Sequence, residues 1–196
     1  MDFKKLANQY RDELLDNVLP FWLEHSQDLE FGGYFSCLDR EGKVFDTDKF
    51  IWLQGREVWM FSMLYNKVEK RQEWLDCAVQ GGEFLKKYGH DGNYNWYFSL
   101  DRSGRPLVEP YNIFSYTFAT MAFGQLSLAT GSQEYADIAK KTFEIILSKV
   151  DNPKGKWNKL HPGTRNLKNF ALPMILCNLA LEIEHLLDPG YLEQTM

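Results

Sequence analysis

Hydrophobic residues recur along the chain at helical spacing, in two kinds of segment that alternate. One kind has an apolar face and a charged face: 2–25, 71–88 and 133–149. The other kind contains few or no charged residues: 50–66, 112–130 and 167–183. A helix with one apolar face is half-buried, whereas a helix that is apolar all round is buried on all sides. The pattern therefore predicts an outer and an inner layer of alternating helices.

The chain also contains a repeat between these helices. The segment YFSCLDREG at 34–42 recurs as YFSLDRSG at 97–104, with one residue fewer. A weaker third copy is expected around Trp157. In both clear copies an aromatic pair is followed by Asp-Arg-x-Gly, which predicts a short extended segment closed by a turn whose glycine has a positive φ. We expect these hairpin-like loops to lie together at one end of the fold.

Together, the repeat and the two kinds of helix predict an all-α fold of about six helices in three helix pairs, which form part of a toroid. We expect residues 1–196 to form one domain. Three pairs cannot close a ring, so the inner layer would leave apolar edges at both ends. The favoured interpretation is a truncated part of a longer protein. The alternative is a natural half-ring that assembles as a homodimer.

The composition narrows the choice of partners. The formal net charge is −5, and the sequence has no basic face for nucleic acid or anionic lipid. It also has no uninterrupted apolar stretch long enough to span a membrane and no secretory leader, so we expect a cytoplasmic protein. Six Trp, ten Tyr and fourteen Phe suit helix packing, and they also suit a platform under a sugar ring. A small neutral ligand fits this composition best.

The segment 52–59 contains the sharpest candidate chemistry. Trp52 and Arg56 are four residues apart and share one face of an otherwise apolar helix. A guanidinium in that position needs an anion, oxygen atoms or water, which points to a polar site. A structural ion pair with Glu57 through a neighbouring helix explains Arg56 equally well. Gly55, in the middle of the same helix, indicates either close packing or the approach of a ligand.

A second candidate follows the second hairpin-like loop. Asn112 can cap the next inner helix, and Tyr111, Phe114 and Phe118 share a face. Core packing can explain each of these three aromatic rings on its own. Together with Trp52 and Arg56, however, the rings could line a cleft the size of a sugar. His25, His90 and His185 fit surface or capping positions, whereas His161 lies in the loop that enters the third inner helix and could reach the mouth of a cleft. No two histidines are spaced as opposed bases. The sequence has no phosphate loop, serine elbow or metal-ligand cluster, so we expect neither a cofactor nor a metal.

Three stretches resemble the N-acylglucosamine 2-epimerase family: FGGYFS at 31–36, KFIWLQGR at 49–56 and FALPMIL at 170–176. The resemblance implies an (α/α)6 barrel, of which this chain supplies the N-terminal half. It also implies a cofactor-free epimerase that removes and returns a proton at C2 of a free sugar. In that scheme Arg56 matches the essential arginine and Trp52 its neighbour in the cleft. The paired catalytic histidines are expected in a C-terminal half that has no counterpart here.

We therefore expect a 2-epimerase that interconverts N-acetylglucosamine and N-acetylmannosamine. Arg56 is the expected catalytic residue, and Trp52, Tyr111 and Phe114 are the expected substrate-binding residues. Sugar isomerases of the same superfamily have a polar residue or a histidine where this chain is apolar at 171–174, and the resemblance therefore implies the N-acyl epimerase branch rather than mannose or cellobiose enzymes. An aldose–ketose isomerase of mannose-type sugars and a non-catalytic sugar-binding half-barrel are the alternatives.

Overall fold

Helices make up most of the protein in a computed structural model that describes residues 2–110, 112–152, 161, 163 and 170–190. The helices are α1 (Phe3–Glu13), the π-helix η1 (Leu14–Val18), α2 (Leu19–His25), α3 (Ile51–Lys67), α4 (Gln72–Tyr88), α5 (Phe114–Thr130), α6 (Gln133–Ser148), α7 (Ala171–Glu182) and the 3-10 helix η3 (Glu184–Leu186). The short strands are β1 (Cys37–Leu38), β2 (Val44–Asp46), β3 (Lys49–Phe50), β4 (Ser99–Leu100) and β5 (Pro106–Val108).

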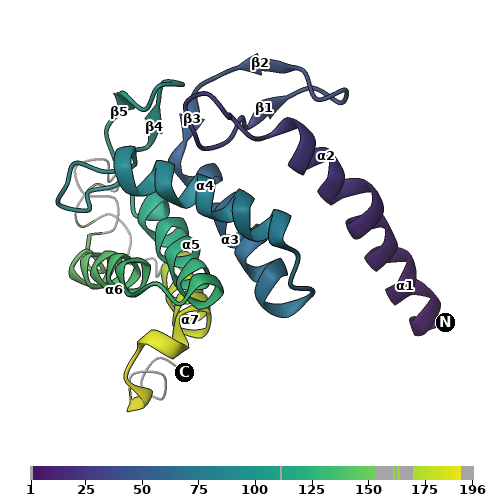
Figure 1. Ribbon diagram of the computed structural model, residues 1–196. Helices are drawn as coiled ribbons and strands as arrows, with labels where there is room; N and C mark the ends of the chain where they lie inside the picture. Colours follow the sequence, from purple (N-terminus) through teal and green to yellow (C-terminus); the bar gives the residue numbers. More distant parts are fainter. Residues whose placement is uncertain (1, 111, 153–160, 162, 164–169, 191–196) are drawn as a thin grey trace.

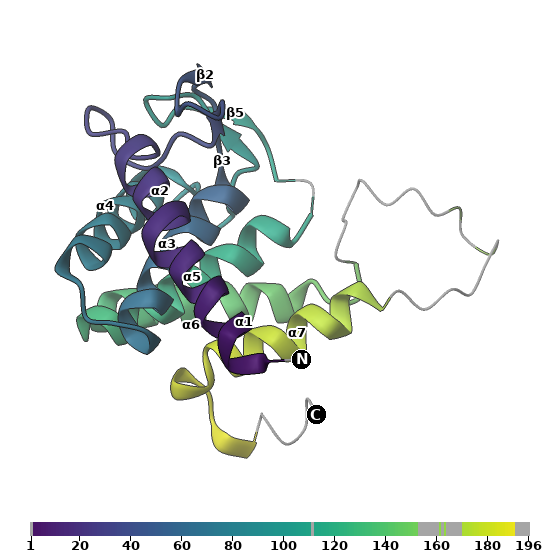
Figure 2. The ribbon, with the colours of Figure 1, turned by 90° about the vertical axis from the view of Figure 1, so that its right-hand side faces the viewer.

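The helices form three pairs, each with one outer and one inner member. The outer helices are α2, α4 and α6, and the inner helices are α3, α5 and α7 (Figures 1 and 2). The first outer helix continues without a break from α1 through η1. Asp2 caps its start, because its carboxylate accepts a hydrogen bond from the N–H of Lys5 at 3.1 Å. The predicted helices and their order are confirmed, which makes the chain half of an α/α toroid.

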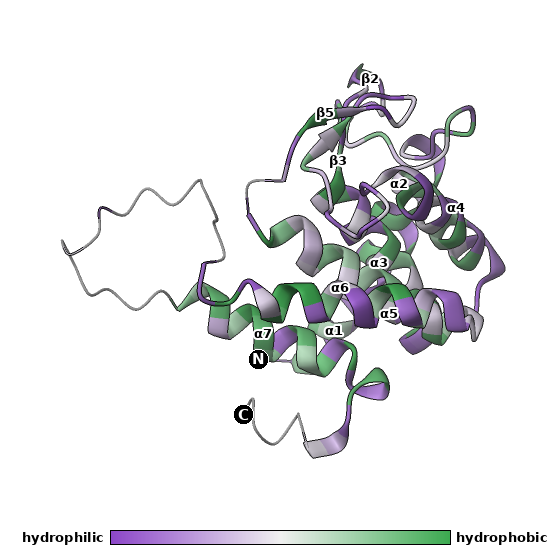
Figure 3. Ribbon diagram, turned by 90° about the vertical axis from the view of Figure 1, so that its left-hand side faces the viewer, coloured by the Kyte–Doolittle hydropathy of each residue, from purple (hydrophilic) through white to green (hydrophobic). Residues whose placement is uncertain are grey.

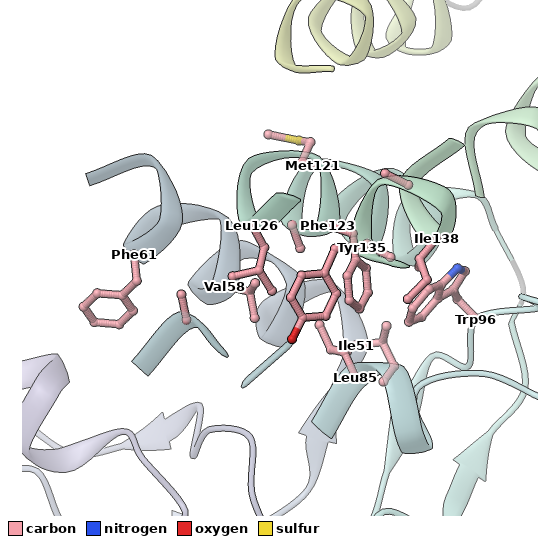
Figure 4. Packing of buried hydrophobic residues seen from close by; sticks show 14 of the residues in the cluster. Ile51, Val58, Phe61, Leu85, Trp96, Met121, Phe123, Leu126, Tyr135 and Ile138 are labelled. Carbon is pink, nitrogen blue, oxygen red and sulfur yellow. The ribbon is translucent and has the colours of Figure 1, made fainter. Parts of the chain in front are cut away.

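The core lies where α3 and α5 pack against each other and against α4 and α6 (Figure 4). Most residues of α5 are buried, as its lack of charged residues predicts. Gly55 allows the close approach of α3 and α5, because a Cβ atom there would lie 2.8 Å from the carbonyl oxygen of Phe118. The packing interpretation of this glycine is therefore confirmed.

The third inner helix, α7, is attached to the wall at its C-terminal end. The carboxylate of Glu182 accepts hydrogen bonds from the indole of Trp59 at 2.9 Å and from the amide of Gln125 at 3.0 Å. Within α7 only Leu179 and Ala180 are buried, although the helix is mostly hydrophobic (Figure 3); Met174, for example, is 54% exposed. The prediction that this helix is buried on all sides is wrong, because no described element covers its outer edge.

The opposite edge of the molecule, formed by α1, also exposes apolar side chains. The apolar face of α1 was expected to be half-buried, but no residue of α1 is buried. Phe3 and Tyr10 are 75% and 74% exposed. Amphipathic spacing predicts the helix correctly, but burial also needs a neighbour, and the described chain has none on this side. Both ends of the arc of helices therefore expose apolar surface.

The repeated loops form antiparallel hairpins at one end of the helices (Figure 1). β1 pairs with β2, whereas β4 pairs with both β3 and β5. Gly42 and Gly104 in the two turns have φ values of 83° and 93°, as predicted from the Asp-Arg-x-Gly motif. The expected third copy around Trp157 lies outside the described residues.

A buried ionic cluster joins the loops of the first two repeats. The ammonium of Lys49 donates to the carboxylate of Asp28 at 2.9 Å and to the carbonyl of Arg102 at 3.0 Å, and the side chains of Lys49 and Asp28 are fully buried. The Arg102 guanidinium also donates to both carboxylate oxygens of Asp28, at 2.9 and 3.0 Å. Burial alone would raise the pKa of Asp28, but the hydrogen bonds from Arg102 and Lys49 outweigh it and hold the pKa at about 2.

Candidate functional site

A cavity of about 520 Å³ opens on the inner wall, at the end near the hairpins. Its lining comes from α3, from the start of α5, from α7 and from the residue before β4. The lining residues are Trp52, Arg56, Phe98, Asn112, Phe114, Ser115, Phe118, Met174 and Ile175. The volume lies in the usual range for small-molecule sites, and the lining is largely aromatic with a few polar groups.

Arg56 is the charged residue of this cavity. Its guanidinium carbon lies 5.0 Å from the centroid of the Trp52 ring and 4.3 Å from that of the Phe118 ring. Each distance is short enough for a cation–π interaction, which orients the planar group without neutralising it. Arg56 is exposed, and it forms no ion pair with a carboxylate of the described residues. The guanidinium of Arg56 therefore presents charged hydrogen-bond donors to the cavity, and the cavity has room for a ligand that carries oxygen atoms.

The start of α5 supplies the opposite side of the cavity. The side-chain oxygen of Asn112 accepts the N–H of Phe114 at 2.9 Å, but the N-cap of α5 is Ile113, without a side-chain cap, rather than the predicted Asn112. Phe114 is 38% exposed and lines the cavity with Trp52 and Arg56. Three of the four predicted site residues are thus brought together. The fourth, Tyr111, lies outside the described residues.

Glu57 does not form the ion pair with Arg56 that the sequence allowed. Its carboxyl group accepts a hydrogen bond from the hydroxyl of Ser26, next to α2. Burial raises the pKa of Glu57 to about 8, although the bond from Ser26 opposes this shift. The group is therefore largely protonated and uncharged near neutral pH. In that state Glu57 offers no counter-charge to Arg56.

A smaller cavity of about 180 Å³ lies on the other side of Arg56, toward α2. It is lined by Trp22, Ser36, Leu53, Arg56, Glu57 and Met60. The hydroxyl oxygen of Ser36 is buried and has no hydrogen-bond partner among the described residues. Arg56 thus borders both cavities.

Several lining residues were not among the predicted site residues. Phe98 belongs to the repeated Tyr-Phe-Ser stretch, and that repetition could have marked it as a residue at the hairpin end of the wall. Met174 and Ile175 lie on α7, far from Arg56 in the sequence. Their contribution depends on the packing of α7 beside α5, for which the sequence gives no local signal.

A model of a known family, described as N-acylglucosamine 2-epimerase (GlcNAc 2-epimerase), matches residues 33–196. The chain belongs to the N-acylglucosamine 2-epimerase family. It is 41% identical over 174 residues to the N-acylglucosamine 2-epimerase of Bos taurus, and the match covers 86% of this chain and 41% of that protein. The corresponding human protein is 40% identical over 174 residues, with 86% and 41% coverage.

More distant relatives are named for another sugar. The cellobiose 2-epimerase of Dictyoglomus turgidum is 29% identical over 167 residues, which cover 81% of this chain and 42% of that protein. The chain therefore spans about two fifths of the length of the curated relatives that it matches. Because the family's proteins are longer, the activity of a whole member is a separate question from the fold of this part.

Solved structures support the fold. A cellobiose 2-epimerase from Bacillus thermoamylovorans superposes with a TM-score of 0.82 at 22% identity, and the superposition covers 98% of this chain and 54% of that one. A D-mannose isomerase gives a TM-score of 0.75 at 19% identity, with 92% and 47% coverage. The three helix pairs correspond to about half of each structure.

Proposed function

We propose that this chain forms the N-terminal part of a sugar 2-epimerase that interconverts N-acetylglucosamine and N-acetylmannosamine. The observation that supports this proposal most directly is the environment of the Arg56 side chain. Its guanidinium is exposed to a cavity, stacked on two aromatic rings and not neutralised by any described carboxylate. Membership of the family indicates the class of reaction. The cavity is large enough to bind one side of the sugar.

Epimerisation at C2 requires an open-chain sugar with its carbonyl at C1. A base removes the C2 proton. The electron pair of that C–H bond forms a double bond between C1 and C2, and the π pair of the carbonyl moves to its oxygen, which produces an enolate. Return of a proton to the opposite face of C2 restores the carbonyl and gives the other epimer. In this scheme Arg56 donates hydrogen bonds to the carbonyl oxygen and stabilises its developing negative charge. Trp52, Phe114 and Phe118 hold the sugar against the wall.

The acid and base groups are a separate requirement. No His, Asp or Glu is among the described residues that line the larger cavity. We therefore infer that the two proton-transferring groups, expected from the resemblance to be histidines, belong to the part of the family's length that this chain does not span. On this proposal the 196-residue chain binds the sugar and does not turn it over.

Two observations support an N-acylated substrate. Identity is 41% to an N-acylglucosamine 2-epimerase but 29% to a cellobiose 2-epimerase. In addition, the α7 side of the cavity is apolar at Met174 and Ile175. A methyl group of an acyl chain packs on such a surface, whereas a hydroxyl group there would lose its hydrogen bonds to water.

The direct test is sugar binding by this chain, measured by ligand-observed saturation-transfer NMR with N-acetylmannosamine, N-acetylglucosamine and mannose. We expect binding of the N-acyl sugars and a loss of at least about tenfold in affinity for Arg56→Ala. Arg105→Ala, which removes an exposed arginine of the second hairpin, is the matched control and should bind like the parent. Equal binding by Arg56→Ala would remove Arg56 from the site.

Turnover is tested in a protein that contains this chain and the remaining length of the family. In deuterated water we expect deuterium at C2 of the product, and Arg56→Ala should lower kcat/KM by about a hundredfold or more. Label at C1 would indicate an aldose–ketose isomerase instead. Sugar binding without any exchange would favour a non-catalytic sugar-binding protein.

A further inference from the structure

The start of α5 presents hydrogen-bond donors to the larger cavity. Asn112, just before the helix, and Ser115, in its first turn, both line this cavity. The side-chain oxygen of Asn112 is already engaged, because it accepts the N–H of Phe114 at 2.9 Å. The amide nitrogen of Asn112 donates to no residue that the structure describes. What Asn112 offers to a ligand in the cavity is therefore mainly the N–H groups of its amide.

Ser115 differs from the other polar residues of the cavity because it is buried. It is 2% exposed, and its hydroxyl has no hydrogen-bond partner among the described residues. A buried hydroxyl without a partner is unfavourable, and folded proteins keep few of them. Since Ser115 lines the cavity, the cavity is the place where a partner for this hydroxyl can bind.

The polar groups of the cavity suit ligand atoms that only accept hydrogen bonds. The guanidinium of Arg56 and the free amide nitrogen of Asn112 can only donate, and no carboxylate lines the cavity in the described part of the chain. A sugar hydroxyl carries a hydrogen atom that needs an acceptor of its own, whereas a carbonyl oxygen carries none. A carbonyl oxygen therefore satisfies these donors and leaves no unpaired hydrogen atom behind.

These donors form two groups on different elements. Arg56 belongs to α3, whereas Asn112 and Ser115 lie at the start of α5. An open-chain N-acyl sugar has two carbonyl oxygens, one at C1 and one in the acyl group on the C2 nitrogen. Open-chain mannose has only the first. Two separate groups of donors thus match an N-acyl sugar better than they match mannose.

We propose that Asn112 and Ser115 determine specificity for the acyl group, because they donate hydrogen bonds to its carbonyl oxygen while Arg56 binds the carbonyl oxygen at C1. This inference rests on the proposed function, since it takes an N-acyl sugar as the ligand of the cavity. The positive end of the α5 dipole strengthens the attraction for the acyl oxygen. The acyl methyl group packs on Met174 and Ile175, the apolar lining from α7.

Ser115→Ala is the first test, because it removes the hydroxyl and changes the size of the side chain little. Calorimetric titration of a protein that contains this chain and the remaining length of the family gives apparent dissociation constants for N-acetylmannosamine and mannose. We expect affinity for N-acetylmannosamine to fall about five- to tenfold and affinity for mannose to stay the same.

Ser62→Ala is the matched control for this change. Ser62 is a fully buried serine of α3 whose hydroxyl also lacks a partner among the described residues, but it does not line the cavity. Its substitution should leave both dissociation constants unchanged. Without ligand, Ser115→Ala should unfold at the temperature of the parent or above it, because alanine favours a helix and leaves no unpaired hydroxyl. A structural role for Ser115 would lower that temperature instead.

Asn112→Asp separates the donor from the start of the helix. The aspartate keeps an oxygen that accepts the N–H of Phe114, but it replaces the amide nitrogen with a second oxygen that repels a carbonyl oxygen. We expect the preference for N-acetylmannosamine over mannose to fall about tenfold or more. Any effect of the new charge on Arg56 applies to both sugars and cancels in this ratio. Circular dichroism checks that the variant remains folded.

The outcomes distinguish this inference from the proposed function. A parent protein that binds mannose as tightly as N-acetylmannosamine would contradict both. A parent that prefers N-acetylmannosamine, together with Ser115→Ala and Asn112→Asp variants that keep the full preference, would overturn the inference alone. Equal losses for the two sugars would also overturn it, because Asn112 and Ser115 would then bind a group that both sugars share.

Discussion

Lys49 and Arg56 differ in their surroundings although both lie near aromatic rings. The Lys49 ammonium lies 4.4 Å from the Phe84 ring centroid, and the Arg56 guanidinium lies 4.3 Å from that of Phe118. Lys49 is fully buried and paired with Asp28, whereas Arg56 is exposed and has no described carboxylate partner. A ring contact therefore does not distinguish a structural cation from a functional one. The two kinds of cation are distinguished by whether a carboxylate is paired with them.

The reason lies in the cost of burying charge. A buried ammonium without a partner is strongly unfavourable, so Lys49 needs Asp28 and the nearby carbonyl groups in order to fold where it is. Arg56 keeps its contact with water, so the folded chain is stable without a counter-charge. The first arrangement holds two loops together, and the second leaves a cation available for a ligand.

Removal of the buried cation should have the largest effect on stability. In Lys49→Met, Asp28 stays buried and retains only Arg102 as a charged partner, so we expect the free energy of unfolding to fall by about 3–5 kcal/mol. Urea denaturation followed by circular dichroism measures this change. Lys43→Met removes an exposed lysine and should change stability by about 0.5 kcal/mol or less. Similar losses in both variants would contradict a structural role for the cluster.

Substitution of Glu57, on the inner wall next to Arg56, should have an intermediate effect on the free energy of unfolding. An unfolded glutamate loses its proton near pH 4.5, whereas Glu57 in the folded chain keeps its proton until about pH 8. This group therefore destabilises the fold progressively as the pH rises between those values. We expect Glu57→Gln to be more stable than the parent by about 1–3 kcal/mol at pH 8, with little difference near pH 4.

Urea denaturation at both pH values measures this effect. Glu24→Gln, an exposed change on α2, should show the same small difference at pH 4 and at pH 8. A gain for Glu57→Gln that did not depend on pH would show that Glu57 is ionised in the folded protein.

Removal of the exposed cation should have the smallest effect on stability. Arg56→Ala loses two ring contacts but leaves no buried charge, so we expect the free energy of unfolding to change by about 1 kcal/mol or less. Thermal unfolding without ligand measures this. A loss as large as that of Lys49→Met would show that Arg56 belongs to the framework of the fold. The difference between the two variants would then teach nothing about ligand binding.

The sequence predicted what depends on neighbouring residues along the chain. Helical periodicity located all three helix pairs, and the repeated Asp-Arg-x-Gly motif located two hairpin turns. It also placed Trp52 beside Arg56, because residues four apart share a helical face. No such pattern reveals the contact between Asp28 and Arg102, which are 74 residues apart. The burial of α1 and α7 was misjudged for a related reason, since periodicity describes a helix but not its neighbours.

None of the helices in the described part of the chain is both long and apolar enough to cross a membrane. The compartment in which the protein works stays a prediction from composition, as does the absence of a cofactor.

Gly55 helps to order part of the ligand site before a ligand binds. It allows the backbones of α3 and α5 to touch at Phe118, and this contact places the Phe118 ring beside the Arg56 guanidinium. The orientation of the cation is thus set by how closely two helices approach, before any ligand arrives. The conformational entropy of that part of the site is lost during folding rather than during binding. A methyl group at position 55 would separate the helices, and affinity would fall without the loss of a single contact residue.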